Sequence, residues 1–102
     1  MRPKTIKRIM RNFLLGLQHI HDKGIMHRDL KPQNLMIAEK GKITQVRIID
    51  FGLATFTNVD EYLYRRCGTP GFIAPEVIKL KAGEKYNEKC DIFSAGVIFY
   101  IL

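Results

Sequence analysis

The chain has 102 residues and a formal net charge of +7, from 17 Lys and Arg against 10 Asp and Glu. This length excludes more than one domain, and a hydrophobic content of 46% excludes a disordered acidic tail. No secretory signal is present, and Cys67 and Cys90 lack the spacing of a zinc site or a disulfide framework, so an intracellular, cytoplasmic protein with two reduced thiols is expected.

A helix is predicted over residues 4–22, because apolar residues recur there at spacings of three and four. They form one stripe: Ile6, Ile9, Met10, Phe13, Leu14, Leu17 and Ile20. Gly24 is expected to end this helix in a left-handed conformation. The basic residues lie opposite the stripe: Lys4, Lys7, Arg8 and Arg11. We interpret them as a solvated face; a nucleic-acid-binding domain is an alternative that rests on net charge alone.

Two β-prone runs, 35–37 and 45–49, flank a polar turn at 39–42 and predict a β-hairpin. The hairpin would bring Asn34, just before its first strand, beside Asp50, just after its second. Residues 53–74 sustain neither helical nor strand periodicity, which indicates a long surface loop of the kind that often carries function. A short helix is expected at 76–80.

A final helix is predicted to begin at residue 87 or 88, and its run 92–102 is almost wholly apolar. This run is too short for a membrane span, which needs about 20 apolar residues, so a buried core helix is expected instead. A helix that is apolar on all sides requires protein around it.

Three segments carry polar residues in a pattern that suits phosphoryl transfer: 27–34 (HRDLKPQN), 50–52 (DFG) and 68–76 (GTPGFIAPE). They match the catalytic loop, the metal-binding loop and the end of the activation segment of eukaryotic protein kinases, which the chain resembles over almost its whole length. Lys31-Pro32 together with Thr69 is similar to the serine/threonine branch, and 67–76 is similar to the calmodulin-dependent group.

The resemblance implies an α+β fold, a fragment of the protein-kinase-like fold. Its parts would be a long helix, the catalytic loop, the β-hairpin, the activation segment and a truncated buried helix. Residues 1–102 would form the middle of the kinase domain, in its C-terminal lobe. The lobe that precedes it and the last helices of the domain would be absent.

By the same resemblance, Asp29 orients the substrate hydroxyl and accepts its proton, while Lys31 contacts the γ-phosphate. Asn34 and Asp50 would hold Mg²⁺ through their oxygens, and Met36 would lie under the adenine. The cofactors implied are ATP and Mg²⁺. The partners implied are the nucleotide and a protein substrate with a serine or threonine acceptor, with no nucleic acid and no membrane.

The resemblance assigns further residues to the scaffold or to regulation: His27, Arg28, Phe51, Gly52, Thr69, Glu76 and Asp91. His27 would pack beneath Phe51 rather than act as a base. Asp91 would accept hydrogen bonds from main-chain groups of the catalytic loop.

Arg28 precedes the catalytic aspartate, a position that the family often couples to a phosphate on the activation loop. The loop offers hydroxyls at Thr55, Thr57, Tyr62 and Tyr64. However, Arg65 stands where many related kinases carry the activating phosphothreonine, which argues against simple control by phosphorylation. Asp60 and Glu61 are interpreted as solvated charges, with pairing to Arg28 as the alternative.

The glycine-rich loop, the strand lysine with its glutamate partner, the adenine-binding hinge and the arginine that pairs with Glu76 have no counterpart in these 102 residues. The leading hypothesis is therefore a fragment of a serine/threonine kinase with little or no activity alone. The alternative is a non-catalytic kinase-lobe module that binds protein partners or competes with an intact relative.

Overall fold

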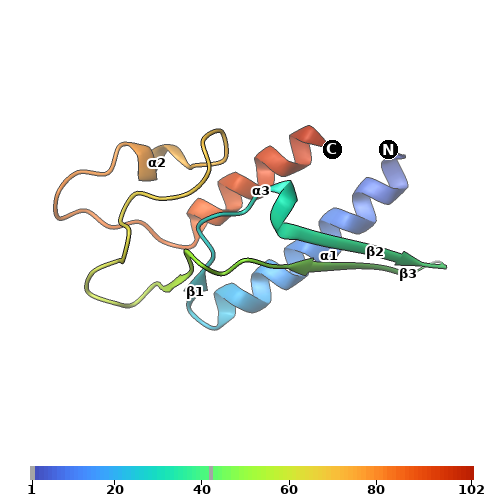
Figure 1. Ribbon diagram of the computed structural model, residues 1–102, viewed down its shortest axis with the longest axis horizontal. Coiled ribbons are helices and arrows are strands. Elements are labelled where there is room, and N and C mark those ends of the chain that lie inside the picture. The colour runs from blue at the N-terminus through green and yellow to red at the C-terminus, as the bar shows by residue number, and fades with distance from the viewer. Residues whose placement is uncertain (1, 42) are drawn as a thin grey trace.

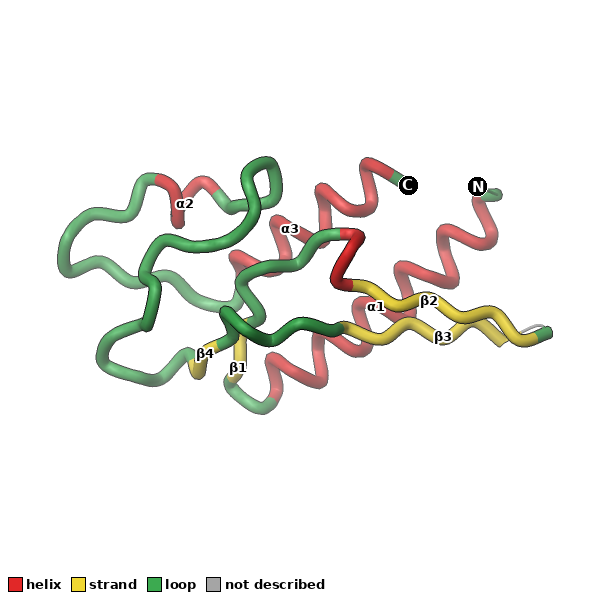
Figure 2. The backbone as a smooth tube through the Cα atoms, viewed as in Figure 1, coloured by secondary structure: helices red, strands yellow, loops and turns green. Residues whose placement is uncertain are grey.

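The computed structural model describes residues 2–41 and 43–102. Its elements follow in the order α1 (Pro3–Asp22), β1 (Ile25–Met26), a 3-10 helix η1 (Pro32–Asn34), β2 (Leu35–Lys40), β3 (Ile43–Ile48), β4 (Thr55–Phe56), α2 (Pro75–Ile78) and α3 (Lys89–Ile101). Helices α1 and α3 lie side by side, and the β2–β3 hairpin runs along α1 (Figure 1). Long loops carry the remaining short elements, as Figure 2 shows. The fold is α+β, as the sequence predicted.

Helix α1 buries a narrower stripe than its periodicity predicted. Pro3 occupies the first turn, where its missing N–H costs nothing. The buried side chains are Ile9, Met10, Phe13 and Leu17. Leu14 belongs to the predicted stripe, but it is 44% exposed because it lies on the edge of the buried face. The core cluster around α1 joins Phe13 and Leu17 to Leu30 of the catalytic loop and to Ile98 of α3. This packing fixes the catalytic loop against both long helices.

Gly24 follows the C-terminus of α1 with φ +73°, as the sequence predicted. An added Cβ would meet Thr57 Oγ1 at 3.9 Å, an ordinary contact, so substitution is penalised by backbone conformation alone. We expect Gly24→Ala to lower the unfolding free energy by about 1 kcal/mol. Gly96→Ala is the matched control, since Gly96 lies inside α3 and an added Cβ there would meet open space, so alanine should stabilise by up to about 1 kcal/mol. Urea denaturation would check both predictions: the midpoint should fall in Gly24→Ala and rise in Gly96→Ala.

The β2–β3 hairpin is present but longer than predicted. Leu35 pairs with Ile48 and Lys40 pairs with Ile43, so residues 39 and 40, which we predicted to lie in the turn, belong to the strand. Residue 42 of that predicted turn lies outside the described residues. At the open end, the Ile49 N–H donates to the Asn34 carbonyl at 2.9 Å. This bond extends the ladder by one step and brings Asn34 next to the residue that precedes Asp50.

A second, two-stranded sheet joins parts of the chain that the sequence analysis left unpaired. Strand β1 pairs antiparallel with β4, with Ile25 opposite Phe56 and Met26 opposite Thr55. The predicted loop 53–74 therefore begins with a short strand that is tied to the end of α1. The predicted helix at 76–80 is shorter and starts earlier, as α2, because Pro75 occupies its first turn.

Helix α3 departs from the prediction of a helix buried on all sides. One side is buried through Cys90, Asp91, Ser94, Ala95 and Ile98. The other side is exposed: Ile92 is 50% exposed, Phe99 56% and Tyr100 90%. The expected burial is therefore found on one side only, because no described residue covers the other face. No helix among the described residues combines the length and apolar character that a membrane span requires.

Candidate active site

Asp91 anchors the catalytic loop from beneath. Its carboxylate is fully buried and accepts hydrogen bonds from the main-chain N–H groups of His27 (2.7 Å) and Arg28 (2.9 Å). The His21 ring nitrogen Nε2 lies 2.9 Å from the same carboxylate. Arg28 adopts a left-handed conformation, φ +73°, which non-glycine residues rarely adopt. The main-chain contacts are those expected of Asp91, whereas the part played by His21 was missed.

His27 links the catalytic loop to the metal-binding loop. The Asp29 N–H donates to His27 Nδ1 at 3.1 Å, which leaves Nε2 as the protonated nitrogen, and Nε2 donates to the Ile49 carbonyl at 2.9 Å. The ring also meets Phe51 edge-on, with 4.9 Å between centroids. Both nitrogens are therefore committed to the scaffold, and His27 has none left for proton transfer or metal binding.

Asp29, Lys31 and Thr69 form a connected polar cluster. The Thr69 hydroxyl donates to Asp29 Oδ1 at 2.7 Å and accepts from Lys31 Nζ at 2.9 Å. Lys31 Nζ also lies 3.9 Å from Asp29 Oδ2. The side-chain amide of Asn34 donates to the Asp29 carbonyl at 2.7 Å. Residues 40 positions apart are thus joined, and the Asp29 carboxylate is held in one orientation.

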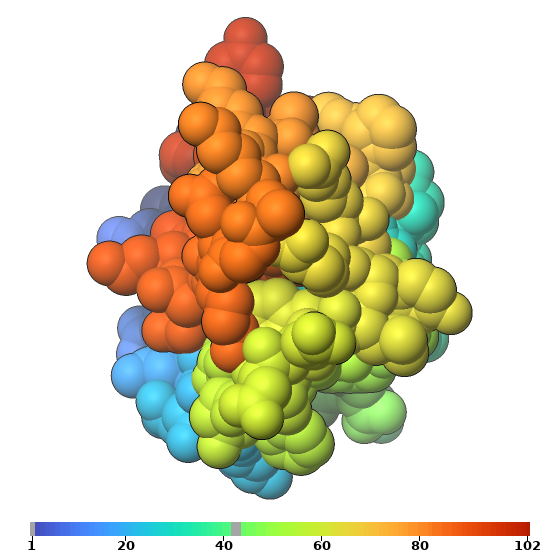
Figure 3. Space-filling view, turned by 90° about the vertical axis from the view of Figure 1, so that its left-hand side faces the viewer, coloured from blue at the N-terminus to red at the C-terminus, as the bar shows by residue number. Residues whose placement is uncertain are grey.

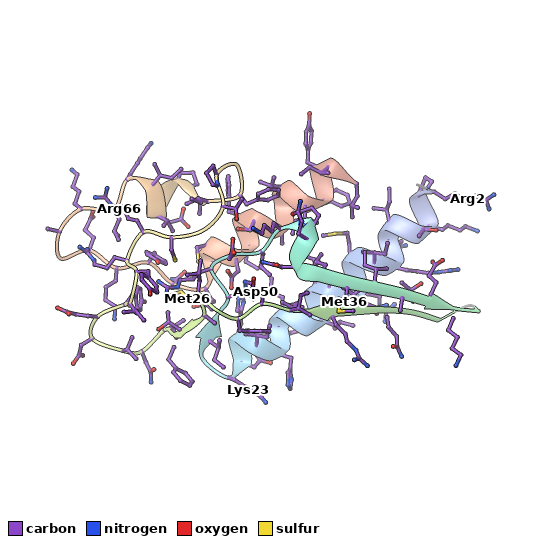
Figure 4. All side chains as sticks on the ribbon, in the orientation of Figure 1. Arg2, Lys23, Met26, Met36, Asp50 and Arg66 are labelled. Atoms are coloured by element: carbon purple, nitrogen blue, oxygen red, sulfur yellow. The ribbon has the colours of Figure 1, made fainter. Side chains whose placement is uncertain are left out.

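Asn34 and Asp50 are the candidate metal ligands. The Nδ2 group of the buried Asn34 is used by the Asp29 carbonyl, so its Oδ1 is the atom left to accept or coordinate. Asp50 is exposed, has φ +59°, and accepts from the Gly52 N–H through Oδ1 at 3.3 Å. Figure 4 shows Asp50 near the middle of the molecule. An amide oxygen and a carboxylate fit Mg²⁺, which takes one or two carboxylates and completes its shell with phosphates and water.

Among the described residues, no group of three His, Cys, Asp or Glu side chains is close enough to hold a metal by itself. A cation at Asn34 and Asp50 would therefore depend on ligands from the nucleotide. This is the usual arrangement for Mg²⁺ in phosphoryl transfer.

Three further predicted residues are exposed: Met36, Phe51 and Glu76. Met36, labelled on the hairpin in Figure 4, is 58% exposed, and Phe51 is 44% exposed. Glu76 is exposed in the first turn of α2, and within the described part of the chain it forms no ion pair. These side chains present open surface rather than a closed nucleotide pocket.

Arg28 does not pair with Asp60 or Glu61 among the described residues, so that alternative is wrong. Its guanidinium donates instead to main-chain carbonyls of the activation segment and to the Tyr86 hydroxyl. Tyr86 was missed, because an aromatic residue just before an apolar helix is typical of core and carries no motif.

Cys67 and Cys90 are free thiols, as predicted, and Cys90 is buried. Burial, with a smaller contribution from Asp91, raises the pKa of Cys90 far above its usual value of about 8.5. Burial also raises the pKa of Cys67.

The raised pKa of Cys90 predicts a loss of stability at alkaline pH. Below about pH 8.5 the thiol is neutral in both states and has no effect; above it the unfolded state ionises first, so stability falls by up to about 1.4 kcal/mol per pH unit. Cys90→Ala should flatten this dependence between about pH 8.5 and 10. Urea denaturation at several pH values would measure it, and parallel pH profiles for the wild type and the variant would contradict it.

Comparison with known proteins agrees with this geometry. Residues 1–102 match the protein kinase domain family. The chain is 44% identical over 97 residues to the probable serine/threonine-protein kinase fhkB of Dictyostelium discoideum, covering 94% of this chain and 8% of that protein. It is 44% identical over 97 residues to the probable serine/threonine-protein kinase 2 of Plasmodium falciparum, covering 95% and 18%. It is 43% identical over 93 residues to the calcium/calmodulin-dependent protein kinase type II of Caenorhabditis elegans, covering 91% and 12%.

The chain therefore belongs to the protein kinase family, and its relatives are named serine/threonine kinases. It spans less than a fifth of the length of each of these three relatives.

Proposed function

We propose that this chain is the central part of a serine/threonine protein kinase, which transfers the γ-phosphoryl group of ATP to a serine or threonine hydroxyl of a protein. The observation that carries the proposal is the polar cluster in which the Asp29 carboxylate lies 2.7 Å from the Thr69 hydroxyl, and that hydroxyl lies 2.9 Å from Lys31 Nζ. A candidate base, a candidate phosphate ligand and the activation segment meet there.

In this site each residue has a distinct task. Asp29 accepts the proton of the attacking hydroxyl, and the hydrogen bonds to its carboxylate and carbonyl hold it at one position. Lys31 places positive charge beside the group that is transferred. Asn34 Oδ1 and the Asp50 carboxylate are the oxygens that would hold Mg²⁺. Bound Mg²⁺–ATP supplies the phosphoryl group and most of the charge neutralisation.

We further propose that the 102-residue chain is inactive by itself. Its residues include no glycine-rich loop and no strand lysine to hold the phosphates, and catalysis of this kind relies on positioning groups that act as a unit. Met36 and Phe51 are exposed, which is consistent with a nucleotide site that lacks the glycine-rich loop and the strand lysine on its other side.

The test compares two polypeptides in a phosphate-transfer assay with Mg²⁺–ATP and a generic serine/threonine peptide. One is the 102-residue chain, and the other is the product of the native transcript sequenced on both sides. We expect transfer only from the longer product, and Asp29→Asn in each provides the control for contaminating kinases. Transfer by the short chain that Asp29→Asn removes would contradict its inactivity. A longer product with a complete nucleotide clamp and no transfer would contradict the kinase assignment.

The second candidate function is a non-catalytic lobe that binds protein partners. The exposed apolar face of α1 and α3 favours it, because open grooves of about 480 and 350 Å³ lie there. They are lined mainly by apolar residues: Ile6, Met10, Leu14, Ile92, Phe99 and Leu102. A native polypeptide of 11.8 kDa in a stable stoichiometric complex would support this function over the first.

A further inference from the structure

The middle of the activation segment is held without main-chain pairing. Within the described part of the chain, no main-chain group from residue 60 to residue 68 bonds to another main-chain group. Figure 3 shows this stretch (yellow) lying against residues 79–88 (orange) on one face of the molecule. A stretch without ladder or turn bonds depends on side chains from other segments for its conformation.

Arg28 supplies most of these side-chain bonds. Its Nε donates to the Leu53 carbonyl at 2.7 Å, Nη2 to the Leu63 carbonyl at 2.6 Å, and Nη1 to the Tyr64 carbonyl at 2.9 Å. Nη1 also donates to the Tyr86 hydroxyl at 3.0 Å. Four of the five N–H groups of this buried guanidinium are therefore used, and little capacity is left for a phosphate.

Tyr86 extends the same set of bonds in both directions. Its hydroxyl accepts from Arg28 and donates to the Arg65 carbonyl at 2.6 Å. Its own carbonyl accepts from the Tyr62 hydroxyl at 2.6 Å. Tyr86 is buried, and burial raises the pKa of its hydroxyl, so the donor proton stays in place at neutral pH. One residue outside the activation segment thus bonds to residue 65 through its hydroxyl and to residue 62 through its carbonyl.

The backbone is strained where Arg28 binds it. Tyr64 has φ +53°, a conformation that non-glycine residues keep only where their surroundings impose it, and its side chain is 61% exposed. The carbonyls on either side of this Cα, those of Leu63 and Tyr64, are the two that Arg28 binds. The strained residue therefore lies between the two carbonyls that Arg28 binds, as expected if these hydrogen bonds impose the conformation of Tyr64.

We propose that Arg28 and Tyr86 form a clamp that fixes residues 62–65 of the activation segment without a phosphate group, and that Tyr86 is a positioning residue. Arg65 stands where many related kinases carry the phosphorylated threonine, and here its carbonyl is bound while its guanidinium donates to the carbonyls of Lys81 and Glu84. Neutral carbonyls thus occupy the donors that would otherwise bind a phosphate. The clamp is supported by the set of hydrogen bonds that Arg28 and Tyr86 make. Its part in catalysis rests on the proposed function.

The test is limited digestion by trypsin of the 102-residue chain, produced in bacteria and verified by mass to be unphosphorylated, because trypsin cleaves after Arg65 and Arg66 in this stretch. We expect Tyr86→Phe to speed cleavage after Arg65 and Arg66 by about tenfold, because the variant loses one buried bridging hydroxyl, while cleavage in α1, after Arg8 and Arg11, stays unchanged. Tyr64→Phe is the matched control: it removes a hydroxyl from the same loop, and that hydroxyl makes no hydrogen bond to a described residue. Unchanged cleavage after Arg65 and Arg66 in Tyr86→Phe, or equal acceleration of cleavage in α1, would overturn the proposal.

If Tyr86→Phe does not fold, Tyr62→Phe replaces it, since it keeps the Tyr86 side chain and removes the hydroxyl that donates to the Tyr86 carbonyl at 2.6 Å and lies 3.1 Å from the Thr57 carbonyl. We expect faster cleavage after Arg65 and Arg66 in this variant too, and no change would equally overturn the clamp. Limited digestion requires no turnover by the chain itself, so an inactive longer product would contradict the proposed function without affecting this result. In an active longer polypeptide, Tyr86→Phe should lower kcat/KM for the peptide severalfold while KM for ATP stays unchanged.

Discussion

Replacing Asp91 with alanine is expected to lower the unfolding free energy by about 3–5 kcal/mol. The carboxylate is fully buried and is the acceptor for the N–H groups of His27 and Arg28 and for the His21 ring. Alanine would leave these donors without a partner, at about 1–3 kcal/mol for each buried group. Domains have total stabilities of only about 5–15 kcal/mol, so this loss would unfold much of the population.

Urea denaturation followed by circular dichroism would measure the effect. Asp60→Ala is the control, because Asp60 is exposed in the activation segment and its removal should cost less than about 0.5 kcal/mol. Equal midpoints for the two variants would show that the catalytic loop does not depend on Asp91. If hydrogen exchange shows that the amides of the catalytic loop lose protection while those of α1 keep it, the local role of the carboxylate is still supported.

The elements that follow from local pattern could be predicted from the sequence. The stripe on α1 has a helical period, Gly24 marks its end, and the hairpin is two β-prone runs around a turn. Errors here were small and had local causes. Leu14 matched the apolar period yet lies on the edge of the buried face, and the strands continue to Lys40 and Ile43 because ladder pairing outweighs the polar character of residues 39 and 40.

The contacts that position the candidate site were harder to predict, because they join residues far apart in the chain. Strands β1 and β4 have two residues each, too few to show a period. His21 and Tyr86 belong to no motif, and each acts by bonding to the main chain or to Asp91 across a long separation. The motifs identified Asp29, Asn34 and Asp50 as a set, but only the structure shows Thr69 bonded to Asp29.

The exposed side of α3 illustrates a different limit. Composition predicted correctly that the helix is apolar on all sides, but composition does not specify which neighbour covers each side. In the structure α1, the catalytic loop and Phe72 cover one side, and Phe99 and Tyr100 stay exposed. A hydrophobic residue is buried only where a partner surface exists, so burial was predicted less well than helix formation.

Asp29→Asn should lower kcat by about 10²–10⁴-fold in any polypeptide that contains these residues and phosphorylates a serine peptide. The amide keeps the shape of the carboxylate, and its oxygen can still accept from the Thr69 hydroxyl at the position where Oδ1 now lies 2.7 Å away. It cannot take up the proton of the attacking hydroxyl. The loss should therefore appear in kcat, with KM for ATP almost unchanged.

Asp60→Asn is again the matched control, since it neutralises an exposed carboxylate of the same loop system and should leave kcat unchanged. Thr69→Val separates orientation from proton transfer: it keeps the Asp29 carboxylate but removes the hydroxyl that holds it and that accepts from Lys31. An intermediate loss in Thr69→Val would indicate that positioning contributes part of the effect of Asp29. A kcat for Asp29→Asn within about tenfold of the wild type would contradict the assignment of Asp29 as the base, because general-base catalysis contributes at least about 10²-fold.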